Sequence, residues 1–140
     1  MEAKALSFDT GLVTFDLNGK ASVTFNPTDS AFVERLFNTF DELDKKQDAY
    51  KAEVEKAEKR EVFDIARKRD AEMRDMIDNA LGASVCDALF GDMNVYAMAN
   101  GLPVWANLLL AIMDEIDTSF ARETKLTDSR IRKYSAKYKK

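Results

Sequence analysis

The stretch PTDSAFVERLFNTFDEL, residues 27–43, decides the fold class of this chain. Its large apolar residues recur every three or four positions, the spacing of one face of an α-helix. They are Phe32, Val33, Leu36, Phe37, Phe40 and Leu43. Upstream, Asn26 is expected to be the N-cap, Pro27 the first helical residue and Asp29 a capping-box acid. The pattern therefore predicts a core-facing helix from residue 27.

This helical region extends far along the chain. Between Pro27 and Gly82 there is no glycine or proline, so helix is expected over 27–81. Of the 32 residues in 44–75, 20 are Asp, Glu, Lys or Arg, and few apolar residues remain there to form a core. One unbroken helix would reach about 80 Å at 1.5 Å per residue, so we expect a bend, in the segment 44–48. The prediction is a long or bent helical region with a charged arm at 44–75.

The residues before this region predict a β-hairpin. Apolar and polar residues alternate on both sides of an Asn-Gly pair at 18–19, which marks a turn. A two-residue turn would set apolar side chains opposite polar ones, whereas a three-residue loop at 17–19 pairs Phe15 with Ala21 and gives one apolar face. Because two strands alone are marginally stable, that face must cover a helix or a partner chain, or gain a third strand from around 5–8.

Apolar helical patterns return after the charged stretch. Met73 and Met76 belong to a stripe that Gly82 should end as a left-handed C-cap. A short helix that Gly91 closes should follow. The Asn-Gly pair at 100–101 predicts a turn before the most hydrophobic helix. The core-facing residues of that helix are Val104, Trp105, Leu108, Leu109, Ile112, Met113, Ile116 and Phe120.

Together these elements predict a mainly α fold with a small N-terminal β-hairpin (α+β). A chain of 140 residues fits a single domain, 1–140. Its predicted parts are the hairpin at 6–26, the helical region at 27–81, a compact helical part at 83–124 and a basic tail at 125–140. The tail carries seven Lys or Arg against one Asp, whereas the preceding residues are acidic and the whole chain has a net charge of −4.

Composition excludes most catalytic classes. The chain has no histidine and a single cysteine, which removes the commonest general base, the commonest zinc ligand and an intramolecular disulfide. We therefore expect no enzyme activity, no catalytic, cofactor-binding or metal-binding residues, and a buried, unreactive thiol at Cys86. No apolar run is long enough to cross a membrane, and the first residues lack the layout of a secretory signal. The expectation is a soluble cytoplasmic protein with no membrane contact.

Two groups of residues are candidate partner contacts. The first is apolar and helical, and for each member core packing is the alternative interpretation. Its members are Phe32, Leu36, Phe37, Phe40, Met73, Met76 and Trp105. The second lies in the basic tail and comprises Arg130, Arg132, Lys133 and Lys137. Basic residues interleaved with tyrosines can bind nucleic acid, but the acidic remainder of the chain would repel a polyanion.

The order of these elements resembles tail assembly chaperones of long-tailed phages that infect Gram-positive bacteria. The segment Val85 to Asp92, with Cys86-Asp87-Ala88-Leu89-Phe90-Gly91 inside it, and the ending Ile131 to Lys140 carry the resemblance. It implies a small, mostly helical, non-catalytic cytoplasmic factor without a cofactor. Such a factor binds the tape measure protein, and tail tube subunits as a second candidate partner, until the tube polymerises around the tape.

Two other functional classes remain open, and so does a homo-oligomer. A structural component of the virion, such as a connector or minor tail protein, would also be acidic, helical and non-catalytic. A nucleic-acid-binding or host-interfering phage regulator would use the basic tail. Binding that falls with salt concentration and is lost when 125–140 is deleted would distinguish the regulator.

Overall fold

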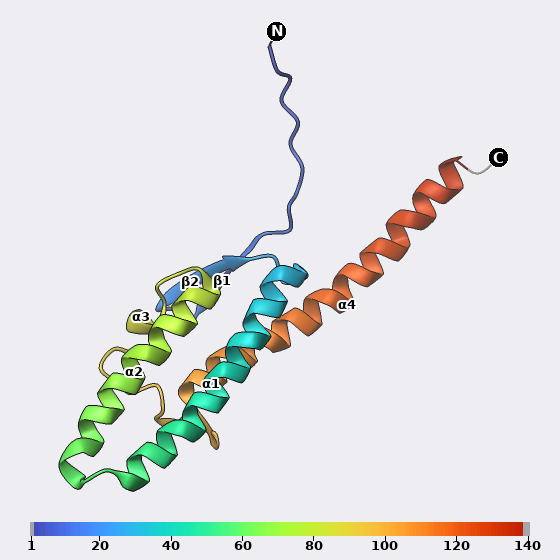
Figure 1. Cartoon of the computed structure of the whole chain (residues 1–140). Coiled ribbons are helices and arrows are strands. Elements are labelled where there is room, and N and C mark those ends of the chain that lie inside the picture. Colours follow the sequence, from blue (N-terminus) through green and yellow to red (C-terminus); the bar gives the residue numbers. More distant parts are fainter. Residues whose placement is uncertain (1, 139–140) are drawn as a thin grey trace.

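The chain is mainly helical, with a two-stranded hairpin near its N-terminus, as predicted (Figure 1). The computed structural model describes residues 2–138, except for the side chains of 127–132 and 134–138. The elements in chain order are β1 (Val13–Leu17), β2 (Ala21–Phe25), α1 (Ser30–Lys56), α2 (Lys59–Leu81), α3 (Cys86–Phe90), β3 (Met98–Ala99), β4 (Leu102–Pro103) and α4 (Val104–Tyr138).

The hairpin has the parity predicted from the alternation, but its register differs by two residues. Leu17 pairs with Ala21, so the three-residue loop is 18–20 and the predicted loop at 17–19 was wrong. Phe15 consequently lies opposite Val23 instead of Ala21. The amide of Lys20 donates to the Leu17 carbonyl at 3.0 Å, and Asn18 and Gly19 both have positive φ. An Asn-Gly pair adopts this conformation at low cost, which allows the tight turn.

The first long helix begins later than predicted. Asp29 is the N-cap of α1, and its carboxylate accepts a hydrogen bond from the Ala31 amide at 3.0 Å. Asn26 instead stabilises the preceding turn, where its Oδ1 accepts from the Thr28 amide at 2.8 Å. A proline at N1 and a carboxylate at the N-cap both suit a helix start, and here the carboxylate determines where the helix begins.

The helical region is bent, as predicted, but the break lies elsewhere. α1 ends at Lys56 and α2 begins at Lys59, so the chain reverses at Ala57 and Glu58 and not in the segment 44–48. The two helices then run antiparallel, side by side (Figure 1). The charged stretch 44–75 therefore forms facing halves of a helical hairpin instead of one projecting helix.

Ion pairs connect the two charged halves. Arg69 bridges them, because its Nη2 lies 2.6 Å from Glu53 Oε2 on α1 and its Nη1 lies 2.7 Å from Glu72 Oε2 on α2. Lys46 on α1 pairs with the second oxygen of Glu72. The hydrogen bond from Lys46, and then that from Arg69, lower the pKa of Glu72 below its usual value of 4.5. Charged residues thus hold α1 against α2 where apolar ones are scarce.

The lowered pKa of Glu72 predicts acid-dependent stability. The ion pairs contribute fully above pH 4.5 and are lost as pH falls through the depressed pKa, because protonation of Glu72 removes its charge. We expect Glu72→Gln to lower the free energy of unfolding at neutral pH and to reduce its fall on acidification. Urea unfolding at about pH 7 and about pH 3 measures both. Glu42→Gln, which removes an exposed carboxylate from α1, should lose as much free energy of unfolding between the two pH values as the wild type. An equal loss for wild type and Glu72→Gln would contradict the prediction.

Side chains of α2 hold the irregular segment that follows it. Gly82 ends α2 with φ 67°, the predicted left-handed C-cap. One carboxylate oxygen of Asp78 then accepts from the amides of Val85 and Cys86 at 3.0 and 3.1 Å, at the start of α3. Farther along, Asp70 accepts from the Val95 amide at 2.7 Å. The segment 83–97 therefore follows the surface of α2 although it contains little regular structure.

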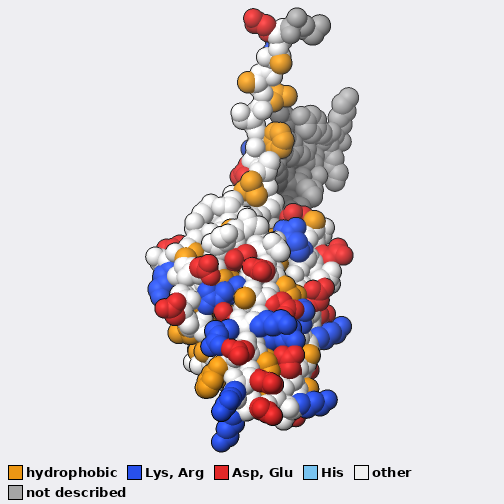
Figure 2. Space-filling model, turned by 60° about the vertical axis from the view of Figure 1, so that its left-hand side comes forward, with side chains coloured by type: hydrophobic (Ala, Val, Ile, Leu, Met, Phe, Trp, Pro, Cys, Tyr) orange, Lys and Arg blue, Asp and Glu red, His pale blue; other side chains and the backbone are white. Residues whose placement is uncertain are grey.

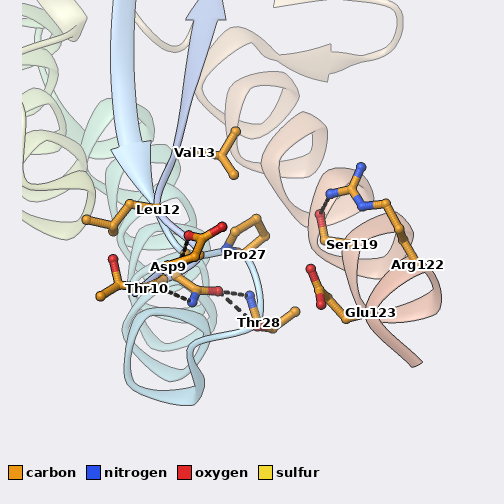
Figure 3. A pocket seen from close by; sticks show the side chains of 11 residues that line it. Asp9, Thr10, Leu12, Val13, Pro27, Thr28, Ser119, Arg122 and Glu123 are labelled. Atoms are coloured by element: carbon orange, nitrogen blue, oxygen red, sulfur yellow. Dashed lines mark hydrogen bonds between the residues drawn. The ribbon is translucent and has the colours of Figure 1, made fainter. Parts of the chain in front are cut away.

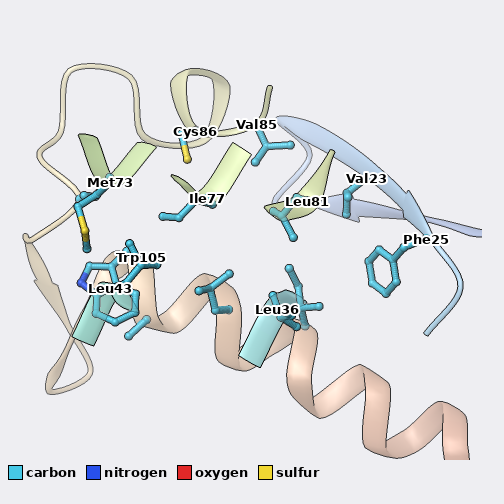
Figure 4. Close-up of a cluster of buried hydrophobic side chains, with 14 of the residues drawn as sticks. Val23, Phe25, Leu36, Leu43, Met73, Ile77, Leu81, Val85, Cys86 and Trp105 are labelled. Carbon is cyan, nitrogen blue, oxygen red and sulfur yellow. The ribbon is translucent and has the colours of Figure 1, made fainter. Parts of the chain in front are cut away.

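The core lies between the hairpin, α1, α2 and the first half of α4 (Figure 4). α4 begins at Val104, directly after β4, and the turn that joins β3 to β4 is at 100–101, where Asn100 and Gly101 both have positive φ as the predicted turn requires. Fully buried side chains from each layer meet there. They include Val23, Leu36, Leu43, Met73, Ile77, Val85, Trp105 and Leu109. The apolar stripes of the sequence thus form one shared core.

Candidate functional site

Most of the predicted apolar contacts belong to this core. Phe32, Leu36, Met73 and Trp105 are at most 3% exposed, so in this conformation none of them can contact a partner. Their burial follows from the bend at 57–58, which folds the stripes of α1 and α2 onto each other and onto α4. For these four residues the core interpretation left open by the sequence is the correct one.

The remaining three apolar candidates are more accessible. Phe40 and Met76 are half-buried and pack against the core, and the Phe40 ring centroid lies 5.3 Å from that of Trp105. Phe37 is 48% exposed on α1. A single exposed phenylalanine is common on protein surfaces and does not by itself define a site.

The basic tail is the continuation of α4. The helix extends through Tyr138, so residues 125–138 are helical. Of the four predicted basic contacts, Lys133 is exposed, and the side chains of Arg130, Arg132 and Lys137 lie outside the described residues. The second half of α4 extends away from the body, and residues 121–126 are all exposed (Figure 1).

The structure places exposed apolar side chains at the end of the molecule where α4 leaves the body. Phe120 and Leu126 are exposed on α4 itself. Residues 2–12 leave the same end as an extended segment, which we call the N-terminal arm (Figures 1 and 2). Leu6 and Phe8 on this arm are 91% and 83% exposed. The third strand around 5–8, one of the alternatives that the sequence left open for covering the apolar face of the hairpin, is not formed.

A groove, which we call the seam, runs between β1 and α4. At its first hollow, of about 410 Å³, Leu17 faces Leu108, with Leu89 and Phe90 of α3 alongside. A second hollow of about 180 Å³ adjoins it between Phe15 and Ile112. Both hollows share lining residues from β1 and α4, so they form one mainly apolar channel.

The third hollow of the seam, of about 340 Å³, is polar (Figure 3). It lies where the base of the arm approaches α4, and Asp9, Asn26, Ser119, Arg122 and Glu123 contribute side chains to its wall. Arg122 Nη2 donates to the buried Ser119 hydroxyl at 3.3 Å, and the Asn26 side chain donates to the Thr10 carbonyl at 2.8 Å. The hollow brings both cationic and anionic side chains to one place.

The thiol of Cys86 is buried, as predicted, at the start of α3. Burial raises the pKa of the thiol, and the nearby negative charge of Asp78 raises it further. The thiolate form, which is the nucleophile, is therefore disfavoured at neutral pH. Among the described residues, no group of three or more Cys, Asp or Glu side chains could hold a metal ion.

The burial of Cys86 predicts slow alkylation. Iodoacetamide should modify the native protein only as fast as the protein opens, and should modify it rapidly in urea, because both burial and the raised pKa protect the thiol. Mass spectrometry over time measures the rate. Ser84→Cys in a Cys86→Ala background is the matched control, since residue 84 is exposed and should react at once. Equal rates for the two native proteins would refute the prediction.

No family model matches the chain, and no curated protein or solved structure matches it either. Within the part of the chain that the structure describes, no helix combines the length and the apolar character needed to cross a membrane.

Proposed function

We propose that this chain is a non-catalytic tail assembly chaperone that binds a helical partner through the projecting half of α4. The partner is a phage tape measure protein, held until the tail tube polymerises, and tail tube subunits are the second candidate. The partner class comes from the resemblance carried by residues 85–92 and 131–140. The single observation that supports binding is the continuation of α4 as an uncovered helix beyond the body.

An uncovered helix of this length favours a partner. Isolated helical segments are marginally stable in water, and most helical stability in proteins comes from packing an apolar face. Phe120 and Leu126 leave apolar surface exposed on α4. A long helical chain with its own apolar face could pack along this helix, as in coiled coils and helix-in-groove complexes.

Charge favours a partner with an acidic segment. Seven basic residues and one acidic residue lie in 125–140, although the chain as a whole carries −4. A basic helix end raises the association rate with an acidic partner and fixes the orientation of binding. The acidic body would at the same time repel a long polyanion such as nucleic acid.

Co-expression with the tape measure protein, followed by pull-down, tests the proposal. The tagged wild-type chain should retain the tape measure protein. Leu126→Asp should weaken retention at least tenfold, about 1.4 kcal/mol, because it places a charge in the proposed interface. The matched control is Phe63→Asp, at a residue that is 71% exposed near the start of α2, at the opposite end of the body. Failure of the wild-type chain to retain either tail protein would refute the proposal.

Two measurements distinguish the other classes. A chaperone should be missing from purified phage particles, whereas a connector or minor tail protein should remain in them. A regulator that binds nucleic acid should bind DNA or RNA with an affinity that falls steeply with salt and that is lost on truncation after Thr124. Retention in particles, or such salt-dependent binding without tape measure binding, would replace the chaperone proposal.

A further inference from the structure

The outer edge of β1 is an unpaired strand edge beside an apolar channel. In the described residues β1 pairs only with β2, so its other edge presents unpaired amide and carbonyl groups. The two apolar hollows of the seam lie between this edge and α4. Edge strands of this kind accept an additional strand, whose main chain pairs with the edge while alternate side chains fill adjacent pockets.

The N-terminal arm has the properties of such a strand. It is extended, and its side chains alternate, with Leu6 and Phe8 on one side and Ser7 and Asp9 on the other. Both apolar side chains are almost fully exposed. The arm therefore carries an uncovered apolar face with the period that the open edge requires.

The arm is directed away from the seam of its own chain (Figure 1). It runs directly into β1, so it would have to reverse at 9–12 to pair with that strand. The hydrogen bond from Asn26 to the Thr10 carbonyl holds the chain at this point. Gly11, at φ 75°, lies so close to Asn26 that an added Cβ would be 2.6 Å from its Nδ2. Because the arm points away from its own chain, it can instead pair with the open β1 edge of a second copy.

We propose that two copies of this chain form a two-fold symmetric dimer in which each arm pairs antiparallel with β1 of the other copy. Leu6 lies opposite Leu17 of the second copy, Phe8 opposite its Phe15 and Thr10 opposite its Val13. This interface is isologous about an axis between residues 11 and 12, where Gly11, at φ 75°, forms a bulge that interrupts the alternation of the strand. Residues 11 and 12 together take one place in the pairing, so the even-numbered side chains of the arm and the odd-numbered ones of β1 lie on the same face. This dimer does not depend on the tail proteins proposed above as partners.

The hollows of the seam determine this register. Leu6 enters the hollow beside Leu17, and Phe8 enters the one between Phe15 and Ile112. Thr10 then lies at the polar hollow, which Val13 also lines. A shift by one residue would turn the polar side of the arm, with its carboxylate, into the apolar channel, which costs free energy.

Sedimentation equilibrium of the full chain tests the dimer. The wild type should have twice the chain mass of 15.8 kDa. Phe8→Asp should raise the dimer dissociation constant at least about 30-fold, as expected for a central apolar contact. Ser7→Asn is the control, because the adjacent side chain faces solvent in the proposed register and a neutral residue adds no like charge opposite Asp16 of the other copy, so the dimer should persist. A wild type that is monomeric at its highest soluble concentration, or a Phe8→Asp dimer of unchanged affinity, overturns the proposal.

Disulfide trapping tests the register. Ser7 of one copy lies opposite Asp16 of the other on the solvent face, within the Cα distance that a disulfide needs. Ser7→Cys with Asp16→Cys should give a covalent dimer with oxidised glutathione. Ser7→Cys with Ser22→Cys is the control, since Ser22 is the neighbour of Asp16 on β2, one strand spacing of about 4.8 Å farther away. Equal cross-linking of the two pairs, or none with Asp16→Cys, overturns this register.

Discussion

Trp105→Ala should lower the free energy of unfolding by about 3–5 kcal/mol, the range for removing a large aromatic side chain from a core. The Trp105 side chain is 1% exposed and lies at the start of α4, where α1 and the segment before α4 meet. Its indole N–H donates to the Gln47 side chain at 2.9 Å, and its ring contacts Phe40. The substitution therefore leaves both a cavity and an unpaired amide.

Urea unfolding followed by circular dichroism measures this effect, since the substitution removes the only tryptophan of the chain. Trp105→Phe keeps most of the ring contact and loses the hydrogen bond, so it should cost about 1–3 kcal/mol. Phe63→Ala removes an aromatic side chain that is mostly exposed, and it should change stability by at most about 0.5 kcal/mol. A loss for Trp105→Ala no larger than that of Phe63→Ala would show that this residue is not central to the core.

Arg74→Ala is the second substitution with a large expected effect, about 3 kcal/mol of lost stability. Arg74 is only 12% exposed and donates to the carboxylates of Asp70 and Asp87 and to the carbonyls of Gly91 and Met93. Burial lowers the pKa of its guanidinium, but the hydrogen bond with Asp87 and the charges of both carboxylates raise it by more. The arginine thus remains charged and holds 91–93 against α2.

Most of this cost should come from the half-buried partners. Asp87 is almost fully exposed and water can replace the arginine there, whereas Asp70 would lose its counter-charge inside the protein. Arg67 lies on α2 seven residues before Arg74 and forms an exposed ion pair with Asp64. Arg67→Ala breaks this pair, is the matched control and should cost at most about 0.5 kcal/mol. Urea unfolding compares the two. Equal losses would mean that Arg74 contributes only as a surface ion pair.

Features set by local backbone chemistry could be predicted from the sequence. Gly82 ends α2 in the left-handed conformation, and Asn100-Gly101 forms the turn before α4. The three-residue hairpin loop also followed from the sequence, because parity decides which side chains share a face. Its placement at 18–20 did not follow, since loops at 17–19 and at 18–20 preserve the same parity.

The break between α1 and α2 had no local signal. Ala57 and Glu58 are both compatible with helix, and neither glycine nor proline occurs nearby. The reversal is favoured by contacts far apart in sequence, such as Arg69 with Glu53 and Trp105 with Gln47. Such pairs become visible only when the chain has turned back on itself.

Core and surface could not be separated by periodicity alone. An apolar stripe marks a face that becomes buried, but it does not tell whether the same chain or another molecule covers it. The structure buries Leu36 and Met73 inside one chain, whereas Leu6 and Phe8 remain uncovered. The candidate partner contacts are therefore on the N-terminal arm and the second half of α4, and not on the strongest helical stripes.

Amide hydrogen exchange in the projecting half of α4 should show whether a partner is bound there. Residues 121–126 of this helix are all exposed, so opening their backbone hydrogen bonds requires little free energy and deuterium should enter quickly. Around Leu109 and Ile116 the same helix is buried, and exchange there should require global unfolding. Any molecule that lies against the projecting turns would slow their exchange, even before its identity is known.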